Sequence, residues 1–230
     1  MTSSKNKTSI LLLGGTGKVS SRIAPLLCAD GYPIILASRS GNAPSLPNCQ
    51  GVKFDWFDET SYANPFTKCN DISAVFIVAP RLVNQVPHSK AFIDLAISKG
   101  VQRIVLLSAS AFEVGDGPMM AAVSKYIVSL GVEYAILRPS WFMENFSEMQ
   151  HARTIREQDC IITGTGQGKV PFISANDIAA VAFRALTDEV AHNTDHLILG
   201  PELFSYDDVC NKVSFLVMQH IVNKIHRPLR

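Results

Sequence analysis

Short apolar runs recur along the chain, separated by stretches in which apolar residues fall at helical spacing. Six of these runs are apolar at nearly every position, a pattern typical of strands buried on both faces of a parallel sheet. The strands expected from it are Ser9–Leu13, Pro33–Ala37, Val52–Phe54, Ala74–Val78, Arg103–Leu107 and Glu133–Leu137.

Three of the intervening stretches have the period of an amphipathic helix, and a glycine follows each of them. Glycine is favoured at that place because it adopts the left-handed conformation that ends many helices. The expected helices and their glycines are Ser20–Asp30 with Gly31, Val83–Lys99 with Gly100, and Pro118–Leu130 with Gly131. Alternating strands and helices predict right-handed βαβ units, and therefore an α/β fold with a doubly wound, parallel, Rossmann-type sheet.

The pattern after the sixth strand is less regular. The elements expected there are a helix at Trp141–Arg156, a glycine-rich turn at Gly164–Gly168, the segment Val170–Ile173, a helix at Asn176–Thr187 and a strand at His196–Leu199. We expect one NAD(P)-binding domain, with a Rossmann core at about residues 9–140 and a small substrate-side lobe at about 141–230.

Composition and charge narrow the class of partner. Twenty-one basic residues balance 20 acidic ones, so no attraction to nucleic acid or to an anionic membrane is expected. The five cysteines form no C-x-x-C pair, and the six histidines, expected at surface or loop positions, lack metal-ligand spacing, so no metal is predicted. The polar start Met1–Ser9 and the short apolar run after it favour a soluble, cytoplasmic protein. A homo-oligomer stays open.

The first strand leads directly into a glycine-rich segment, Gly14–Ser20, with the sequence GGTGKVS. This is a variant of the dinucleotide-binding fingerprint, in which glycines let the backbone turn tightly and approach a pyrophosphate at the start of the next helix. Gly14 and Gly17 fill those roles, and Ser20 replaces the third glycine, which predicts slightly looser packing of the helix on the strand. The alternative is a glycine-rich turn without a ligand, and the position between strand and helix argues against it.

The residues after the second strand indicate which nucleotide is bound. An NAD-specific protein usually places a carboxylate there, whereas this chain has Ser38, Arg39 and Ser40. A guanidinium can pair bidentately with a 2′-phosphate, and flanking hydroxyls can donate to it. NADPH is therefore the predicted cofactor, and the alternative is that Arg39 is only a solvated loop residue.

Two further cofactor contacts are expected from position alone. Asp55 and Trp56 follow the third strand, where such folds commonly contact the adenine. Ala79 and Pro80 follow the fourth strand, beside the expected position of the ribose.

The catalytic pair of common short-chain dehydrogenases, Tyr-x-x-x-Lys, is absent. Ser108 and Ser110 follow the fifth strand, where the partner serine would stand, but Lys125 and Tyr126 have the wrong order and are expected to be non-catalytic. A chain without the tyrosine acid suits reduction of an iminium ion, because hydride addition to C=N⁺ gives a neutral amine without a simultaneous proton transfer. A serine-hydrolase elbow, G-x-S-x-G, is also absent.

An aromatic pocket could then orient a cationic substrate. Trp141, Phe142 and Phe146 follow the sixth strand, at the edge of the sheet where ligands of doubly wound folds bind. A ring facing a cation contributes about 0.5 to 2 kcal/mol. The alternative is that these aromatic side chains pack in the core.

The chain resembles the festuclavine or agroclavine dehydrogenase family, within the NmrA-like atypical short-chain dehydrogenases. The resemblance covers about residues 10–209, and its most specific part is the RPSWFMEN run within Leu137–Phe146. The other matching segments are Leu11–Lys18, Phe54–Trp56, Val105–Ser110, Val170–Ala179 and Leu199–Asp208.

This resemblance implies NADPH-dependent reduction of the cyclic iminium formed from chanoclavine-I aldehyde, an indole alkaloid precursor, to a clavine alkaloid. It implies that the pyrophosphate is held by Gly14, Thr16, Gly17, Lys18 and Val19. It also implies that Arg39 binds the 2′-phosphate, that Ser108 and Pro139 lie at the nicotinamide end, and that Ser110, Trp141 and Phe142 border the substrate, with Ser110 as the candidate catalytic residue.

The end of the chain departs from the family pattern. Family members are expected to continue for several tens of residues beyond the Gly200–Leu203 region, and the stretch Phe215–Arg230 has no recognisable counterpart. A partly open substrate pocket is expected from this. Two other functions therefore stay open: an NADP-binding regulator or redox sensor of the NmrA type, and a reductase similar to the isoflavone or quinone reductases.

Overall fold

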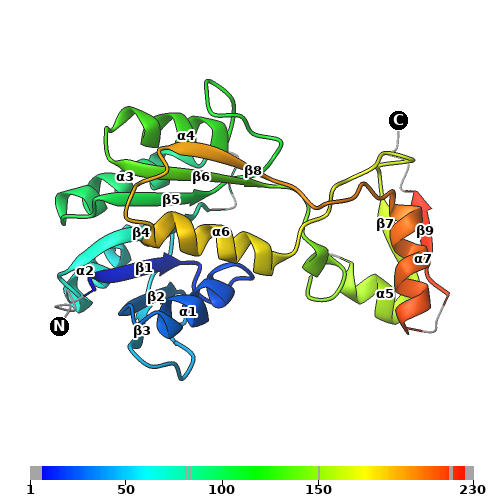
Figure 1. The fold of residues 1–230 in the computed structure, drawn as a ribbon, viewed down its shortest axis with the longest axis horizontal. Helices are drawn as coiled ribbons and strands as arrows, with labels where there is room; N and C mark the ends of the chain where they lie inside the picture. The colour runs from blue at the N-terminus through cyan, green and yellow to red at the C-terminus, as the bar shows by residue number, and fades with distance from the viewer. Residues whose placement is uncertain (1–6, 81, 83, 150, 218–219, 226–230) are drawn as a thin grey trace. The chain divides into compact units, whose positions relative to one another are not determined.

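Figure 1 shows the ribbon of the computed structural model, which describes residues 7–80, 82, 84–149, 151–217 and 220–225. Four parts of the sequence expectations lie outside the described residues. They are the polar start before Lys7, the first residue of the helix expected from position 83, position 150 of the helix expected at Trp141–Arg156, and positions 218–219 and 226–230 of the final stretch.

A seven-stranded sheet, in the order β3-β2-β1-β4-β5-β6-β8, forms the centre of the larger unit. Its strands are β1 (Ser9–Leu13), β2 (Ile34–Ser38), β3 (Cys49–Lys53), β4 (Ile72–Val78), β5 (Arg103–Leu107), β6 (Glu133–Pro139) and β8 (Thr194–Ile198). Neighbours among β1 to β6 are parallel, as in the pairing of Val78 with Leu107. The predicted doubly wound α/β fold is confirmed.

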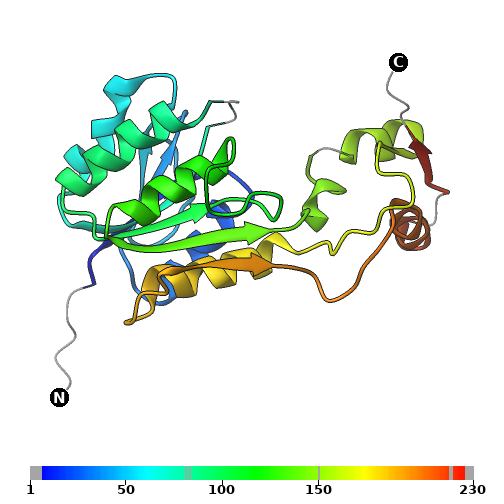
Figure 2. The same ribbon diagram turned by 90° about the horizontal axis from the view of Figure 1, so that it is seen from above.

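The helices of this unit are α1 (Ser20–Ala29), α2 (Asn64–Lys68), α3 (Val86–Ser98), α4 (Met120–Ser129) and α6 (Ala175–Thr187), with the 3-10 turn η1 (Glu59–Ala63) before α2. As Figures 1 and 2 show, α3 and α4 cover one face of the sheet, and α1 and α6 cover the other. The glycines after α1, α3 and α4 have positive φ angles of 78°, 96° and 70°. These predicted helix ends are confirmed.

The core of the larger unit is formed by strand residues together with the inward faces of the helices. All five residues of β1 and of β2 are buried. Leu11, Leu13, Val75, Ile104 and Leu106 belong to one cluster of buried side chains that α3 and α4 cover. This burial explains why the strands were readable from their apolar runs.

Strand β3 differs from the prediction, which placed it at Val52–Phe54. The observed strand begins at Cys49 and ends at Lys53. It lies at the edge of the sheet and is only partly buried, so its residues need not be apolar. The sequence signal was therefore weak.

The chain passes between two compact units. Residues 1–138 and 176–197 form the larger unit, and residues 139–175 and 198–230 form the smaller one. The expected division of the chain near residue 140 remains a prediction, and most of α6 and β8 lies in the larger unit. Among the described residues, no helix combines the length and the apolar character needed to cross a membrane.

The smaller unit has its own sheet and core. Its elements are the 3-10 turn η2 (Met143–Asn145), α5 (Ala152–Gln158), β7 (Cys160–Thr163), α7 (Tyr206–Val217) and β9 (Val222–Ile225). Strands β7 and β9 pair in parallel, with Cys160 opposite Val222. Ile155, Ile161, Phe172 and Tyr206 contribute to the buried cluster between these elements. The turn predicted at Gly164–Gly168 is present, with Gly166 at φ 56°.

The single helix predicted at Trp141–Arg156 is wrong. The Ile173 amide donates to the Trp141 carbonyl at 2.9 Å, and the Met143 amide donates to the Ile173 carbonyl at 2.9 Å. These bonds hold Phe142 in an extended conformation, as part of a short bridge to Ile173. The backbone of residues 141–143 therefore pairs with a distant segment, and an α-helix begins only at Ala152.

Candidate functional site

The glycine-rich segment after β1 forms a tight turn. Gly14 has φ 62°, and the Gly17 amide donates to the Gly14 carbonyl at 2.7 Å. A Cβ atom at Gly17 would lie 2.9 Å from that same carbonyl oxygen. The Gly15 amide donates to Ala37 of β2 at 2.9 Å. The turn requires glycine for close backbone approach, which keeps the surface in front of α1 free of side chains at these positions.

The start of α1 offers unused hydrogen-bond donors. Among the hydrogen bonds of the described residues, the amides of Thr16 and Val19 have no acceptor. The first turn of α1 contains no acidic residue that would occupy these amides or repel an anion. The helix dipole adds a partial positive charge at the same place. A diphosphate matches this arrangement in both charge and hydrogen bonding.

Ser20 has a more specific role than the looser packing expected of it. Its side chain is buried, and its Oγ donates to the Leu13 carbonyl at 2.8 Å. This bond ties the first turn of α1 to the last residue of β1. The serine therefore fixes the position of the glycine-rich turn through a hydrogen bond, where a glycine would allow close packing.

Arg39 lies at the end of β2, exposed to solvent. Its neighbours shape the turn: Ser38 Oγ lies 3.2 Å from Ser40 Oγ and accepts from the Gly41 amide at 3.2 Å. Among the described residues, no carboxylate pairs with the Arg39 guanidinium. Its charge is thus available to an anionic group.

Trp56 is part of the core as well as a candidate cofactor contact. Its indole Nε1 donates to the Val78 carbonyl at 3.0 Å. The ring packs edge-on against Phe54 and Phe92, at centroid distances of 5.0 and 5.6 Å. Tyr62 Oη donates to the Trp56 carbonyl at 2.8 Å, and burial, with help from nearby carboxylates, raises the pKa of Tyr62 to about 12. The adenine contact stays a prediction.

The remaining cofactor residues of this unit lie close to the ends of β3 and β4. Asp55 Oδ1 accepts from the Phe57 amide at 3.0 Å, so its carboxylate shapes the local turn. Ala79 and Pro80 follow β4 and are buried. Their predicted contact with the ribose is not tested by this geometry.

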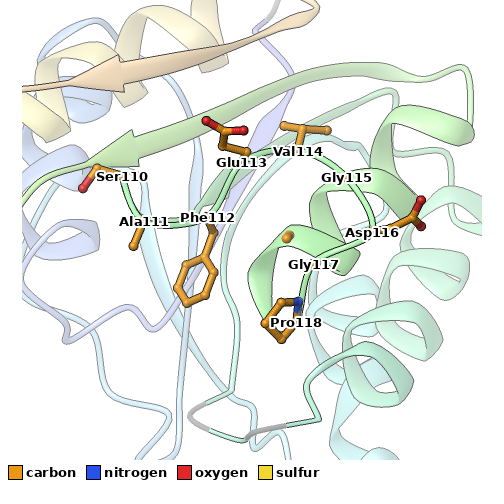
Figure 3. A pocket seen from close by; sticks show the side chains of 10 residues that line it. Ser110, Ala111, Phe112, Glu113, Val114, Gly115, Asp116, Gly117 and Pro118 are labelled. Atoms are coloured by element: carbon orange, nitrogen blue, oxygen red, sulfur yellow. The ribbon is translucent and has the colours of Figure 1, made fainter.

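Ser108 and Ser110 follow β5, as expected, but their environments differ. The Ser108 amide donates to the Leu137 carbonyl of β6 at 2.7 Å, while its Oγ is buried without a hydrogen-bond partner among the described residues. Ser110 lies at one end of a loop that lines a pocket of about 480 Å³ (Figure 3). In this view Phe112 and Pro118 project from the same side of the loop.

The pocket has an acidic rim. Glu113 and Asp116 line it, and Asp116 pairs with Lys125, the lysine that sequence reasoning set apart from catalysis. Lys125 is half exposed and lies on α4, so its contact with the loop is an ordinary surface ion pair. Among the described residues, Glu113 has no ion-pair partner. The pocket edge thus suits a cationic ligand better than an anionic one.

The three candidate substrate residues lie in the smaller unit and differ in exposure. Trp141 is 46% exposed, and Phe142 is partly buried. Phe146 stacks on His151 at a centroid distance of 5.4 Å and packs edge-on against Phe172 at 5.3 Å. Core packing accounts for Phe146, whereas Trp141 keeps a free aromatic surface. Their contact with substrate stays a prediction, as does that of Pro139 with the nicotinamide.

Sequence reasoning missed His151, which it placed at the surface. The side chain is only 3% exposed, and its Nε2 has no hydrogen-bond partner among the described residues. Burial lowers the pKa of His151, so the imidazole is neutral at pH 7. His151 lies among mostly polar and charged sequence neighbours, such as Glu148 and Arg153, so the local sequence predicts exposure and gives no signal of burial.

Two further buried polar residues were also missed. Gln85 and Ser89 are each 1% exposed, and Gln85 Oε1 and Ser89 Oγ lack hydrogen-bond partners among the described residues. A signal did exist for Ser89. It lies three and four positions before Phe92 and Ile93, on the face of α3 that packs on the sheet.

Comparison with protein families matches residues 6–223 to the model of the NmrA-like family. Among curated proteins, the chain is 44% identical over 221 residues to festuclavine synthase I of Penicillium roqueforti, covering 94% of this chain and 76% of the relative. It is 44% identical over 218 residues to agroclavine dehydrogenase of Claviceps fusiformis, covering 92% and 74%.

Solved structures show the same fold at low sequence identity. A triphenylmethane reductase of Citrobacter sp. in complex with NADP(H) has a TM-score of 0.76 at 19% identity, over 95% of this chain and 79% of that one. An NADPH-dependent quinone oxidoreductase of Escherichia coli, in complex with NADPH, has a TM-score of 0.73 at 17% identity, over 94% and 78%. These likenesses concern the fold alone.

Proposed function

Because the chain belongs to the NmrA-like family and groups there with festuclavine synthases and agroclavine dehydrogenases, we propose that it is an NADPH-dependent oxidoreductase of clavine alkaloid formation. Its substrate is the cyclic iminium derived from chanoclavine-I aldehyde, and its product is a clavine of the festuclavine or agroclavine type. The observation that carries this proposal is the glycine turn with free amides, followed by an unpaired arginine at the end of β2.

The residues present fit NADPH. The amides of Thr16 and Val19, with Gly14, Gly17 and Lys18 around them, offer a cradle for the pyrophosphate. Arg39, assisted by Ser38, would bind the 2′-phosphate, and among the described residues no carboxylate forms an ion pair with Arg39. When bound, NADPH supplies a hydride at its nicotinamide ring.

The remaining chemistry needs orientation more than acid catalysis. An iminium carbon accepts a hydride and yields a neutral amine, so the missing Tyr-x-x-x-Lys pair is no obstacle. In the larger unit, the chain contributes Ser110 at the edge of the pocket and the Glu113 carboxylate, which has no ion-pair partner among the described residues. In the smaller unit, Trp141 has an exposed ring. A carboxylate and an aromatic face both stabilise a cation. Placement of the reacting carbon can itself lower the barrier by several kcal/mol.

The experiment mixes the purified chain with NADPH and chanoclavine-I aldehyde, with and without glutathione, and follows NADPH absorbance together with the mass of the amine product. We expect NADPH consumption with formation of a clavine. A parallel reaction with a quinone, in place of the aldehyde, separates this function from that of a quinone reductase.

Cofactor binding is measured beside turnover by the change in NADPH fluorescence. Binding of NADPH without any hydride transfer to the iminium would overturn the enzymatic proposal, and it would favour the NADP-binding regulator. Consumption of NADPH with the quinone alone would assign the site to a different reductase.

A further inference from the structure

Arg138 connects the last strands of the larger unit to the loop that carries Ser110. It is the next-to-last residue of β6, and its side chain is 13% exposed. Its Nη1 pairs with Asp195 Oδ2 of β8 at 2.5 Å. Its Nη2 donates to the Ser110 carbonyl at 3.4 Å, a long bond in which the donor carries a full charge. One side chain thus bridges β8 and the loop after β5.

We propose that Arg138 is a positioning residue, which holds the Ser110 loop in the conformation needed for hydride transfer and which Asp195 keeps in place. This inference rests on the proposed function, since it concerns the substrate side of that same site. Arg138 itself is not assigned a contact with substrate or cofactor.

The planar guanidinium explains why an arginine suits this position. It presents donors in two directions from a rigid fork, so it can bond a carboxylate and a carbonyl at once. A lysine retains the charge and can pair with Asp195, but its single ammonium cannot keep the same two directions. This arrangement leaves one donor of the guanidinium unsatisfied, because the Nε atom of Arg138 is buried without a hydrogen-bond partner among the described residues.

The loop has few other bonds that would fix it. Within residues 109–118, the Phe112 amide donates to the Ala109 carbonyl at 3.0 Å, the Pro118 carbonyl accepts from the Ala121 amide at 3.2 Å, and Asp116 pairs with the exposed end of Lys125. Gly115 and Gly117 add backbone freedom to this segment. The Arg138 bond to Ser110 therefore acts at the start of a segment that is otherwise weakly restrained, directly at the pocket.

The chain contains a matched control for this role. Arg103, the first residue of β5, has the same kind of partly buried fork. Its Nε pairs with Glu133 at 2.7 Å, and its Nη1 donates to the carbonyls of Leu186 at 3.2 Å and Asp188 at 2.6 Å. Because β5 begins at Arg103 and ends just before Ser108, the Arg103 side chain lies at the end of β5 opposite to the Ser110 loop.

The test compares Arg138→Lys, Arg138→Gln and Asp195→Asn with Arg103→Lys, in the full chain. Hydrogen exchange of residues 109–118 is measured by mass spectrometry, together with kcat, KM for the iminium, and the dissociation constant of NADPH. For both Arg138 variants we expect faster exchange in this loop and a loss of kcat of about tenfold or more, since small misplacement is costly in catalysis. The affinity for NADPH should stay within about twofold of wild type.

Arg103→Lys is the control, because we expect it to lower the thermal stability about as much as Arg138→Lys does. It should leave both the exchange of residues 109–118 and kcat unchanged, and Asp195→Asn should fall between wild type and Arg138→Gln. Unchanged exchange in the Arg138 variants would overturn the inference, as would faster exchange with an unaltered kcat. If the wild-type chain itself reduces no iminium, the proposed function is wrong, and the exchange data alone then decide whether Arg138 holds the loop.

Discussion

The indole Nε1 of Trp56 donates a hydrogen bond of 3.0 Å to the carbonyl oxygen of Val78. This bond joins the residues after β3 to the last residue of β4. Val78 in turn lies under the glycine-rich turn, since a Cβ atom at Gly14 would come within 3.3 Å of the Val78 Cβ. The tryptophan is therefore bonded to the residue that packs directly against the glycine-rich turn.

Replacing Trp56 by phenylalanine keeps an aromatic ring and removes the donor. We expect a loss of about 1 kcal/mol in the free energy of unfolding, as for a typical buried hydrogen bond. The melting temperature should fall by about 2 to 4 °C for a chain of this size. Trp141→Phe is the matched control, because that side chain is 46% exposed. Equal melting temperatures for the Trp56 variant and wild type would contradict the role given to this bond.

In the proposed site, we expect Arg39 to determine which nucleotide is bound. Arg39→Ala should raise the dissociation constant of NADPH by about 10- to 100-fold, because hydrogen bonds to charged groups contribute about 1.5 to 3 kcal/mol. The dissociation constant of NADH should change little, and titration calorimetry with both nucleotides measures the difference. Arg156→Ala makes the same change of net charge on the exposed side of α5. An equal loss of affinity for both nucleotides would show that Arg39 does not read the 2′-phosphate.

Ser89 carries a buried hydroxyl that has no hydrogen-bond partner among the described residues, so its removal is expected to stabilise the fold. An unsatisfied buried polar group costs about 1 to 3 kcal/mol, and Ser89→Ala should raise the unfolding free energy by part of that amount. Ser124 is equally buried, but its Oγ donates to the Met120 carbonyl at 2.8 Å. Ser124→Ala should therefore destabilise the chain, by about 1 kcal/mol. Denaturant unfolding of the two variants should give shifts of opposite sign, and shifts of the same sign would refute the argument.

His151 should make stability depend on pH on the acid side. Burial lowers the pKa of His151 in the folded chain below its ordinary value of 6.5. The unfolded chain therefore binds a proton more readily, and stability falls as the pH drops below about 6.5, until the folded-state pKa is passed. His151→Gln should make the loss of stability between about pH 7.5 and 5 smaller than in wild type.

Two other histidines serve as controls for this measurement. His196 also has a pKa lowered by burial, so His196→Gln should also make the loss of stability on the acid side smaller, independently of His151. His220 is exposed, and His220→Gln should leave the slope unchanged. If the slope of the His151 variant equals that of wild type, proton binding to this imidazole does not govern acid stability.

The part of the fold that sequence could predict is the part whose strands are buried on both faces. The residues of β1 and β2 are all buried. The same apolar run therefore stabilises each strand in the core and makes it recognisable in the sequence. Strand β3 was misplaced because one edge and part of its surface face solvent. The strand's extent follows from pairing with β2, which no local pattern records.

The smaller unit was poorly predicted for a related reason. Its strands β7 and β9 are four residues each and pair across about 60 positions of sequence. The extended backbone at Phe142 likewise depends on Ile173, a partner that lies far along the chain. This long-range pairing replaces the helix that was predicted from Trp141 onward.

At the candidate site, the sequence predicted the glycine turn, which the structure contains, because that turn depends on local chemistry. The role of Arg39 stays a prediction. The bonds that give Ser20 and Arg138 their roles could not be predicted, since each depends on an atom from another element. The same holds for Trp56, where position suggested an adenine contact and the structure adds a hydrogen bond to β4.

The interleaving of the two units has a consequence for the order of folding. Residues 139–175 contain β7, whose partner β9 follows only at Val222–Ile225, after the chain has returned to the larger sheet to form β8. During synthesis, the larger unit can complete its sheet once β8 has left the ribosome. At that point β9, the only strand that pairs with β7 among the described residues, has not yet emerged. Such distant pairing is slow, because closing the intervening loop costs entropy before the contacts between the strands form and offset that cost. The smaller unit should therefore fold last, after the sheet of the larger unit is already complete.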